Sequence, residues 1–267
     1  MLRLGMSTEA TAKLRARRLL SRHGRWLVPA LLVTQLLVAC AYLGEKGTPG
    51  GDHASGGTSA FVYFATLPPG SALPSGPECA ARVRRDAWEP RPENRAANHV
   101  TGHVMPDLEG ASRQANRTLV PRINGKFTGT TDEIIQWGAC KWGIDENILR
   151  AQAVQESDWN QATVGDNGQS FGILQIKATV LTGTYPASRK STAFNVDYVL
   201  ARWRVCYEGG FSRHGWLPAE ARGDLWGCIG VHFSGEWMDD AARRYIARVK
   251  RRLRDEDWVS WGYPAKR

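Results

Sequence analysis

The sequence has few cysteines, no apparent internal repeat and little positive charge outside its first forty residues. None of the five cysteines among 267 residues shows metal-ligand spacing, so we expect no metal site. Residues 1–40 hold +6 of the formal charge of +9, and the remaining +3 is too weak and scattered to predict nucleic-acid binding. The hydrophobic fraction of 42% allows an ordinary core, which excludes a fibrous or wholly disordered chain.

The N-terminus has the pattern of a secretion signal. Basic residues from Lys13 to Arg25 precede an apolar run that ends in Leu37-Val-Ala-Cys40. The small residues before Cys40 resemble a bacterial lipobox, which implies a signal peptide over 1–40 and lipidation of Cys40. Ordinary cleavage or an uncut anchor stays open, because residues 26–43 are just long enough to span a membrane. We therefore expect an exported, membrane-anchored protein that faces the cell wall.

Four cysteines remain after Cys40, an even number in a chain bound for an oxidising compartment. This predicts two disulfides, with four free buried thiols as the alternative. Among the three possible pairings we expect Cys206 with Cys228 and Cys79 with Cys140, because cysteines close in sequence lose less entropy on pairing.

The chain divides by composition at about residues 60 and 128. Residues 41–60 are rich in Gly, Ser and Thr and predict a flexible linker. Residues 61–128 are rich in Pro, Arg and Asn with little periodicity, so we expect an extended arm that wraps the next domain. Residues 129–258 have helical spacing and should form that domain.

Helix signals dominate the second half of the chain. Thr130 and Glu133 offer a capping box for a helix that ends near Gly143, and a second helix should span 145–157. A Gly-rich stretch at 164–172 predicts a small hairpin or turn cluster. Further helices are expected at about 192–207, 224–233 and 236–254. The fold class is therefore α+β, mostly α.

Glu156 ends an apolar stripe on the second of these helices. Leu149, Ala153 and Glu156 are spaced i, i+4, i+7 and share a face with Ile148. Partial desolvation and the negative end of the helix dipole should both raise the pKa of this carboxyl. A carboxylic acid that keeps its proton near neutral pH suits general acid catalysis at a glycosidic oxygen. The alternative is an ordinary surface glutamate in a last turn.

Two motifs in this region carry a resemblance to a known superfamily. Glu156-Ser157 ends a helix, and Gly172-Ile-Leu-Gln175 follows the Gly-rich stretch. This order resembles lytic transglycosylases and goose-type lysozymes of the lysozyme-like superfamily, over about residues 132–253. The resemblance implies a lysozyme-like domain without metal or organic cofactor, in which Glu156 protonates the bond between N-acetylmuramic acid and N-acetylglucosamine of peptidoglycan strands. Ser157 would support the acid, and the cleft would be lined by Gly172, Ile173, Leu174 and Gln175.

Asp166 decides between two mechanisms. It resembles the hairpin Asp of goose-type lysozymes, where it would be the second carboxylate of an inverting hydrolase, about 6.5–9.5 Å from the acid. A lytic transglycosylase needs no second carboxylate, because the 6-hydroxyl of muramic acid attacks C1. Asp166 also suits a turn in Asp-Asn-Gly for backbone reasons alone. Asp158 is a weaker candidate that we expect to be solvated.

The third motif of the superfamily departs from its pattern. A Tyr-Asn pair is expected near the cleft, and this chain has His232 and Phe233 there. His232 either replaces the tyrosine as a partner of Glu156 or is a satisfied core residue. The departure also supports an alternative reading, a catalytically inactive wall-binding protein, and a secreted disulfide-stapled module is a third.

Eleven tryptophans suit a glycan-binding protein, because aromatic rings pack against flat sugar faces. We expect a monomer, and the aromatic residues that could line its cleft are Trp159, Tyr185, Trp216, Phe233 and Trp237. Those on helix stripes, Trp137, Trp203 and Trp226, are expected in the core. The basic run at 250–254 ends a helix, where cations suit the dipole, and is either solvated or attracts anionic wall polymers.

Overall fold

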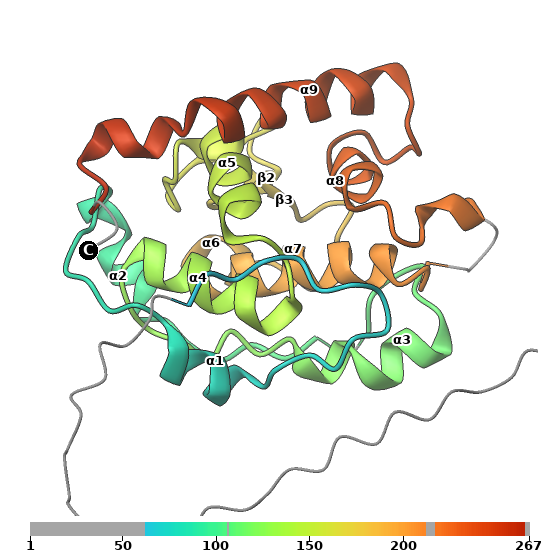
Figure 1. Cartoon of the computed structure of the whole chain (residues 1–267), viewed down its shortest axis with the longest axis horizontal. Coiled ribbons are helices and arrows are strands. Elements are labelled where there is room, and N and C mark those ends of the chain that lie inside the picture. Colours follow the sequence, from blue (N-terminus) through green and yellow to red (C-terminus); the bar gives the residue numbers. More distant parts are fainter. Residues whose placement is uncertain (1–61, 106, 212–216, 265–267) are drawn as a thin grey trace, which may run out of the picture. The chain divides into compact units, whose positions relative to one another are not determined.

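The computed structural model describes residues 62–105, 107–211 and 217–264. These residues belong to the second of two units into which the chain divides, Gly57–Arg267. The described part is mostly helical with one small antiparallel sheet, which confirms the coarse fold class (Figure 1). The predicted signal peptide, the linker, Cys40 and Trp216 lie outside the described residues. Within the described ranges, no helix combines the length and apolar character needed to cross a bilayer.

Two adjacent helices begin and end as their sequence signals predict. Helix α4 spans Thr131–Trp142, with a reciprocal capping box between Thr130 and Glu133. It ends at Gly143, whose φ of 57° is the left-handed conformation that glycine adopts without steric cost. Helix α5 spans Glu146–Ser157 and is capped by the carboxylate of Asp145. These caps fix the direction in which α5 presents its last turn.

The Gly-rich stretch forms a three-stranded antiparallel sheet. Its strands are β1 Val164–Gly165, β2 Ser170–Phe171 and β3 Ile176–Lys177, in spatial order β1-β2-β3. Val164 pairs with Phe171, and Ser170 pairs with Lys177. The sheet therefore contains the small hairpin expected at 164–172, with one further strand.

The remaining helices lie close to their predicted ranges. They are α6 Ala187–Lys190, α7 Thr192–Tyr207, α8 Leu225–Ser234 and α9 Asp240–Asp255, with 3₁₀ turns at Ala219–Ala221 and Asp257–Trp261. The last helix begins four residues later than the expected Glu236, because Asp239 caps it by accepting a hydrogen bond from the Ala242 amide at 2.7 Å. Met238, which falls within the expected range 236–254, precedes the helix with a φ of 51°.

Residues 62–128 are not the simple extended arm that their composition predicts. They contain α1 Gly76–Arg82, α2 Arg95–Asn98 and α3 Arg113–Thr118, and 3₁₀ turns at Pro92–Asn94 and Val120–Arg122. Two of these helices begin at serine caps rather than with an amphipathic pattern: Ser75 caps α1 and Ser112 caps α3, whereas α2 has no side-chain cap. The stretches between them are extended. Helices of four to seven residues are too short to show a periodic pattern.

A buried carboxylate ties this N-terminal part to α4 and α7. Asp197 of α7 accepts hydrogen bonds at 2.7 Å from both Lys141 Nζ and Trp142 Nε1. It also accepts the backbone N–H groups of Asn124 and Gly125. All of these donors converge on a side chain with no exposed surface, so removal of the Lys141 charge would leave a buried carboxylate poorly compensated.

Two disulfides connect the helices, and their pairing is the one predicted. Cys79–Cys140 joins α1 to α4, and Cys206–Cys228 joins α7 to α8. The second bridge holds α8 in place next to α7.

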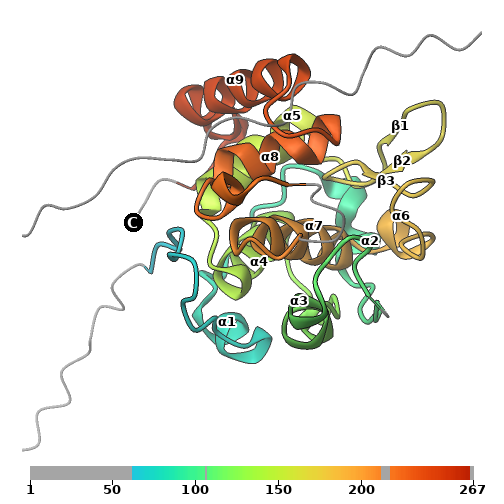
Figure 2. The same cartoon turned by 90° about the vertical axis from the view of Figure 1, so that its right-hand side faces the viewer.

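Helix α9 lies across α5 and α8, on the opposite side from α3 (Figures 1 and 2). Its buried face consists of Ala242, Tyr245, Ile246 and Val249. At Gly230 of α8 a Cβ atom would lie only 2.9 Å from the Ile246 side chain, so glycine permits the close approach of α8 and α9. This approach places Tyr245 beside the end of α5.

Candidate active site

Glu156 is the penultimate residue of α5 and receives two hydrogen bonds from neighbouring side chains. The Tyr245 hydroxyl donates to Glu156 Oε1, and Gln152 Nε2 donates to the same oxygen at 3.3 Å. Among the described residues both donors converge on Oε1. The other oxygen, Oε2, is therefore the one that can carry a transferable proton.

The surroundings of Glu156 raise its pKa to about 7. Burial is the largest cause, and the negative charge of Asp166 raises the pKa further. The Tyr245 hydrogen bond and the positive charge of Arg248 act in the opposite direction. The side chain lies deep within the protein yet keeps some accessible surface. This carboxyl is thus close to half protonated at neutral pH.

Tyr245 of α9 is the residue of this site that sequence analysis missed. It is buried, and its pKa lies well above the ordinary value because of that burial and of Glu156, so its hydroxyl keeps its proton and acts as a donor. Its ring stacks on Phe233 with centroids 4.5 Å apart, and the Arg248 guanidinium lies over both rings. The available signal was a tyrosine on a buried helix face, since a buried hydroxyl requires a partner.

His232 is bonded to the motif turn and not to Glu156. Its Nε2 lies 3.2 Å from the Leu174 carbonyl oxygen, and burial lowers its pKa to about 4. The neutral ring therefore donates this hydrogen bond at physiological pH, as expected for a satisfied core histidine. The neighbouring Phe233, whose ring stacks on that of Tyr245, is 50% exposed.

Ser157 connects the end of α5 to the turn at 172–175. Its Oγ donates to the Ile173 carbonyl oxygen at 2.9 Å. At Gly172, where φ is 83°, a Cβ atom would lie 2.2 Å from Asn195 Nδ2. The turn can pack this tightly only with glycine there.

The side chains of this turn do not line an open cleft as the resemblance implies. Ile173 and Leu174 have no exposed surface, and their amides donate to Gln161 and Asn195. They serve instead to fix the turn against the end of α5. Gln175 is partly exposed, with Nε2 donating to the Gly172 carbonyl oxygen at 2.8 Å, so it is the turn's one side chain with accessible surface.

Asp166 lies in the turn between β1 and β2. Its φ of 49° and that of 54° at Asn167 are left-handed conformations that Asp and Asn tolerate, in agreement with a turn role. Its carboxylate accepts from Ser170 Oγ at 2.7 Å and lies 3.5 Å from Lys177 Nζ. These two contacts lower its pKa, with the Ser170 hydrogen bond the larger cause. Asp166 is therefore charged at neutral pH. Asp158 is exposed, as expected.

The aromatic candidates divide between core and surface. Trp159 was expected against sugar, but it has no exposed surface, packs edge-on to Trp88 and Trp261, and donates to the Arg150 carbonyl oxygen. Tyr185 is 53% exposed and packs on Phe171. Of the other tryptophans considered, Trp137 and Trp203 are buried in the core, and Trp226 and Trp237 are partly buried and pack against it.

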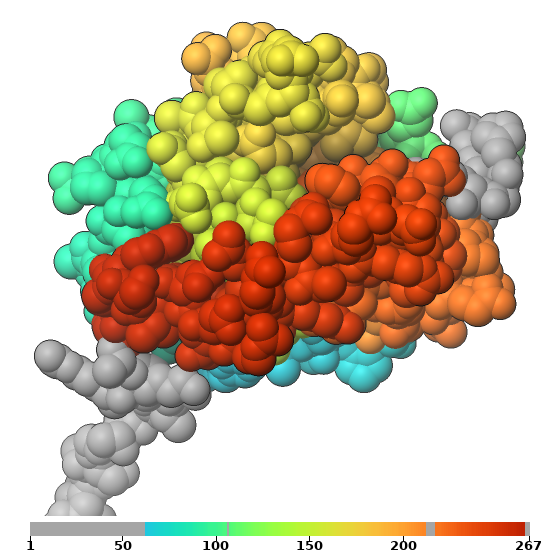
Figure 3. Space-filling model, turned by 90° about the horizontal axis from the view of Figure 1, so that it is seen from above, coloured from blue at the N-terminus to red at the C-terminus, as the bar shows by residue number. Residues whose placement is uncertain are grey.

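Several elements share the surface around α5. Seen from the α9 side, the yellow-green surface of α5 lies in a shallow hollow between the yellow sheet region and the red and orange helices α9 and α8 (Figure 3). Glu156, near the end of α5, is itself only partly buried.

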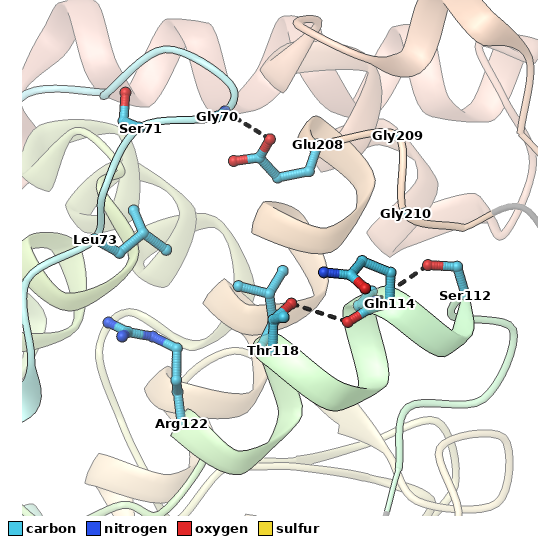
Figure 4. A pocket seen from close by; sticks show the side chains of 12 residues that line it. Gly70, Ser71, Leu73, Ser112, Gln114, Thr118, Arg122, Glu208, Gly209 and Gly210 are labelled. Atoms are coloured by element: carbon cyan, nitrogen blue, oxygen red, sulfur yellow. Dashed lines mark hydrogen bonds between the residues drawn. The ribbon is translucent and has the colours of Figure 1, made fainter.

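A pocket of about 560 Å³ lies elsewhere, between residues 70–73, α3 and the end of α7 (Figure 4). None of the predicted site residues lines it. Its Glu208 accepts from the Gly70 amide at 2.7 Å and from Arg204, and its Arg122 donates to the Lys141 carbonyl oxygen. The charged groups of this pocket are thus bonded within the protein.

No family model, curated protein or solved structure matches this chain. Across the residues that the structure describes, no group of three or more His, Cys, Asp or Glu is arranged to hold a metal ion.

Proposed function

We propose that this protein cleaves peptidoglycan between N-acetylmuramic acid and N-acetylglucosamine, with Glu156 as the general acid and base. The observation that carries the proposal is a single carboxyl whose pKa is raised to about 7 and whose Oε1 is fixed by the Tyr245 hydroxyl. A general acid works best when its pKa is close to the working pH.

The reaction begins with transfer of the Oε2 proton to the glycosidic oxygen, which leaves as the 4-hydroxyl of N-acetylglucosamine. The C1–O bond breaks and positive charge develops at C1 of the muramic acid, which the newly charged Glu156 stabilises. Glu156 then accepts the proton of the 6-hydroxyl as that oxygen attacks C1. The products are a 1,6-anhydro end and a regenerated acid. Tyr245 holds Oε1 throughout, so that Oε2 gives up and takes back the proton.

We favour a lytic transglycosylase over a hydrolysing muramidase. An inverting hydrolase requires a base that removes a proton from water. Asp166 is a weak base, because its contacts with Ser170 and Lys177 stabilise the charged carboxylate and lower its pKa. The same two contacts fix the position of the carboxylate. One observation favours the hydrolase: the charge of Asp166 is close enough to Glu156 to raise its pKa.

The inactive wall-binding alternative rests on the altered third motif. Tyr245 weakens the case for this alternative. Its hydroxyl, on α9, donates to Glu156, whereas His232 on α8 donates to the Leu174 carbonyl oxygen instead. Ser157, Gly172 and the buried turn between them keep the end of α5 in place. These contacts support a working acid.

We also infer that the enzyme acts as a monomer outside the cytoplasm, held to a membrane through lipidated Cys40. The sequence pattern at 1–40 supports export, and the two disulfides suit an oxidising compartment.

Product analysis tests the proposal. The purified full-length protein is incubated with peptidoglycan, and the released muropeptides are weighed. We expect anhydro ends, each lighter by one water than a reducing end. Reducing ends would show a hydrolase instead, and the absence of products would favour the wall-binding alternative. The Asp166→Asn variant adds a second criterion, since it should cripple a hydrolase and leave a transglycosylase largely active.

A further inference from the structure

Helix α9 concentrates positive charge that the sequence alone made appear scattered. Its sixteen residues contain seven Lys or Arg and two Asp, a net charge of +5. The whole chain after Cys40 carries only +3, so the residues outside α9 are together slightly acidic. The basicity of the exported part therefore belongs to one helix.

The cations of α9 lie on its solvent side. The opposite side is buried against α5 and α8, and α9 runs uncovered along the surface in Figures 1 and 3. From residue 243 to residue 254 the helix extends about 16 Å at 1.5 Å per residue. We call the exposed cations the α9 basic face: Arg243, Arg244, Lys250, Arg251 and Arg254.

Acidic side chains within the protein neutralise little of this face. Among the described residues, Arg254 forms an exposed pair with Asp255 at 3.3 Å, and Arg243 and Arg251 form no ion pair. Exposed pairs of this kind contribute little. Like charges three and four residues apart on a helix destabilise it, so a row of cations is a cost that an anionic partner would relieve.

The α9 basic face and the candidate active site share one helix. On the same helix, Tyr245 donates to Glu156, and the Arg248 guanidinium lies 5.3 Å from the Phe233 ring centroid. A glycan strand with its scissile bond at Glu156 must therefore pass next to α9. The peptides that hang from its muramic acids would reach the helix surface.

From this juxtaposition we propose that the α9 basic face binds the carboxylates of the peptides carried by the glycan strand, an inference that rests on the proposed function. The enzyme thus selects strands that still bear acidic peptides. A membrane surface fits less well, because helices that lie on bilayers insert an apolar face, and the apolar face of α9 is already buried in the core. Between the exposed cations at 243–244 and those at 250–254, the exposed residue is Ala247, whose methyl group offers little apolar surface to insert into a bilayer.

Binding to two forms of the wall tests the proposal. The full-length Glu156→Gln protein, which should not cut during the assay, is sedimented with intact peptidoglycan and with strands freed of peptide by an amidase. Arg243→Glu with Arg251→Glu should weaken binding to intact wall on the order of 10-fold at low salt, and the difference should shrink at high salt. Binding to peptide-free strands should fall much less, because after amidase cleavage each muramic acid keeps only the one carboxylate that held the peptide. The matched control is Arg113→Glu with Arg117→Glu, two exposed arginines of α3, on the opposite side from α9.

Several results would overturn the proposal. These are unchanged binding to intact wall, an equal loss on peptide-free strands, or an equal loss in the α3 control. Circular dichroism shows whether the double variant folds. If it does not, two other measurements decide the same question: binding by each single variant, and the salt dependence with which the Glu156→Gln protein binds intact wall and peptide-free strands. Charge-dependent binding by a wild-type protein that cuts nothing would reject the proposed activity alone. Cleavage with charge-independent binding would reject the basic face alone.

Discussion

Replacing the acid with its amide should make the folded protein more stable at alkaline pH. In Glu156→Gln the side chain keeps its shape and can still accept the Tyr245 hydrogen bond, but it cannot ionise. The carboxyl has a pKa of about 7 in the folded protein against an ordinary 4.5, which corresponds to about 3 kcal/mol of lost stability once it is charged. Because the group keeps some contact with solvent, we expect about 1–2 kcal/mol.

The sign of this effect follows from proton binding in the two states. Below pH 4.5 both folded and unfolded chains hold the proton, so the carboxyl has no cost. As the pH rises from 4.5 to 7 the unfolded chain loses its proton first, and the wild type becomes less stable. Above pH 7 the full cost is present. The variant escapes it over the whole range.

Urea unfolding with the disulfides intact measures the difference. The stability gained by Glu156→Gln should be close to zero at pH 4.5 and reach about 1–2 kcal/mol at pH 8.5. Glu220→Gln makes the same chemical change at an exposed glutamate away from the site and is the matched control. A gain that is equal at both pH values, or a loss at pH 8.5, would refute the assignment of a raised pKa to Glu156.

Three further changes test other parts of the site and fold. Tyr245→Phe should lower the cleavage rate about 10- to 100-fold. It should also move the alkaline limb of the pH–rate profile upward, because the Tyr245 hydrogen bond lowers the pKa of Glu156 and its loss therefore raises that pKa; an unchanged rate would remove Tyr245 from the site. Arg248→Gln should move the same limb upward through loss of its positive charge, and a downward move would contradict this. Cys79→Ser with Cys140→Ser should cost about 4 kcal/mol in urea unfolding, since the bridge closes a loop of 61 residues, and an unchanged midpoint would deny it a structural role.

The features predicted correctly from sequence are those set by local interactions. The capping box at Thr130 and Glu133 lies within one turn, and it fixed the start of α4. The disulfide pairing follows from the short separation of 22 residues between Cys206 and Cys228. The Gly-rich stretch between α5 and the next helix could only form turns and short strands.

The features that were missed depend on contacts between distant residues. Tyr245 and Glu156 are 89 residues apart, and only the packing of α9 on α5 brings them together. Trp159 follows the motif glutamate closely, yet it turns inward and is buried against Trp88. The charge of α9 was hidden in the total because acidic residues elsewhere offset it.

Cleavage of peptidoglycan by the wild type and by Glu156→Gln, side by side, tests the central claim most directly. We predict that the wild type releases muropeptides and that the variant is slower by roughly 10² to 10⁴, the usual contribution of a general acid. A folded variant that cuts as fast as the wild type would contradict the role given to this carboxyl.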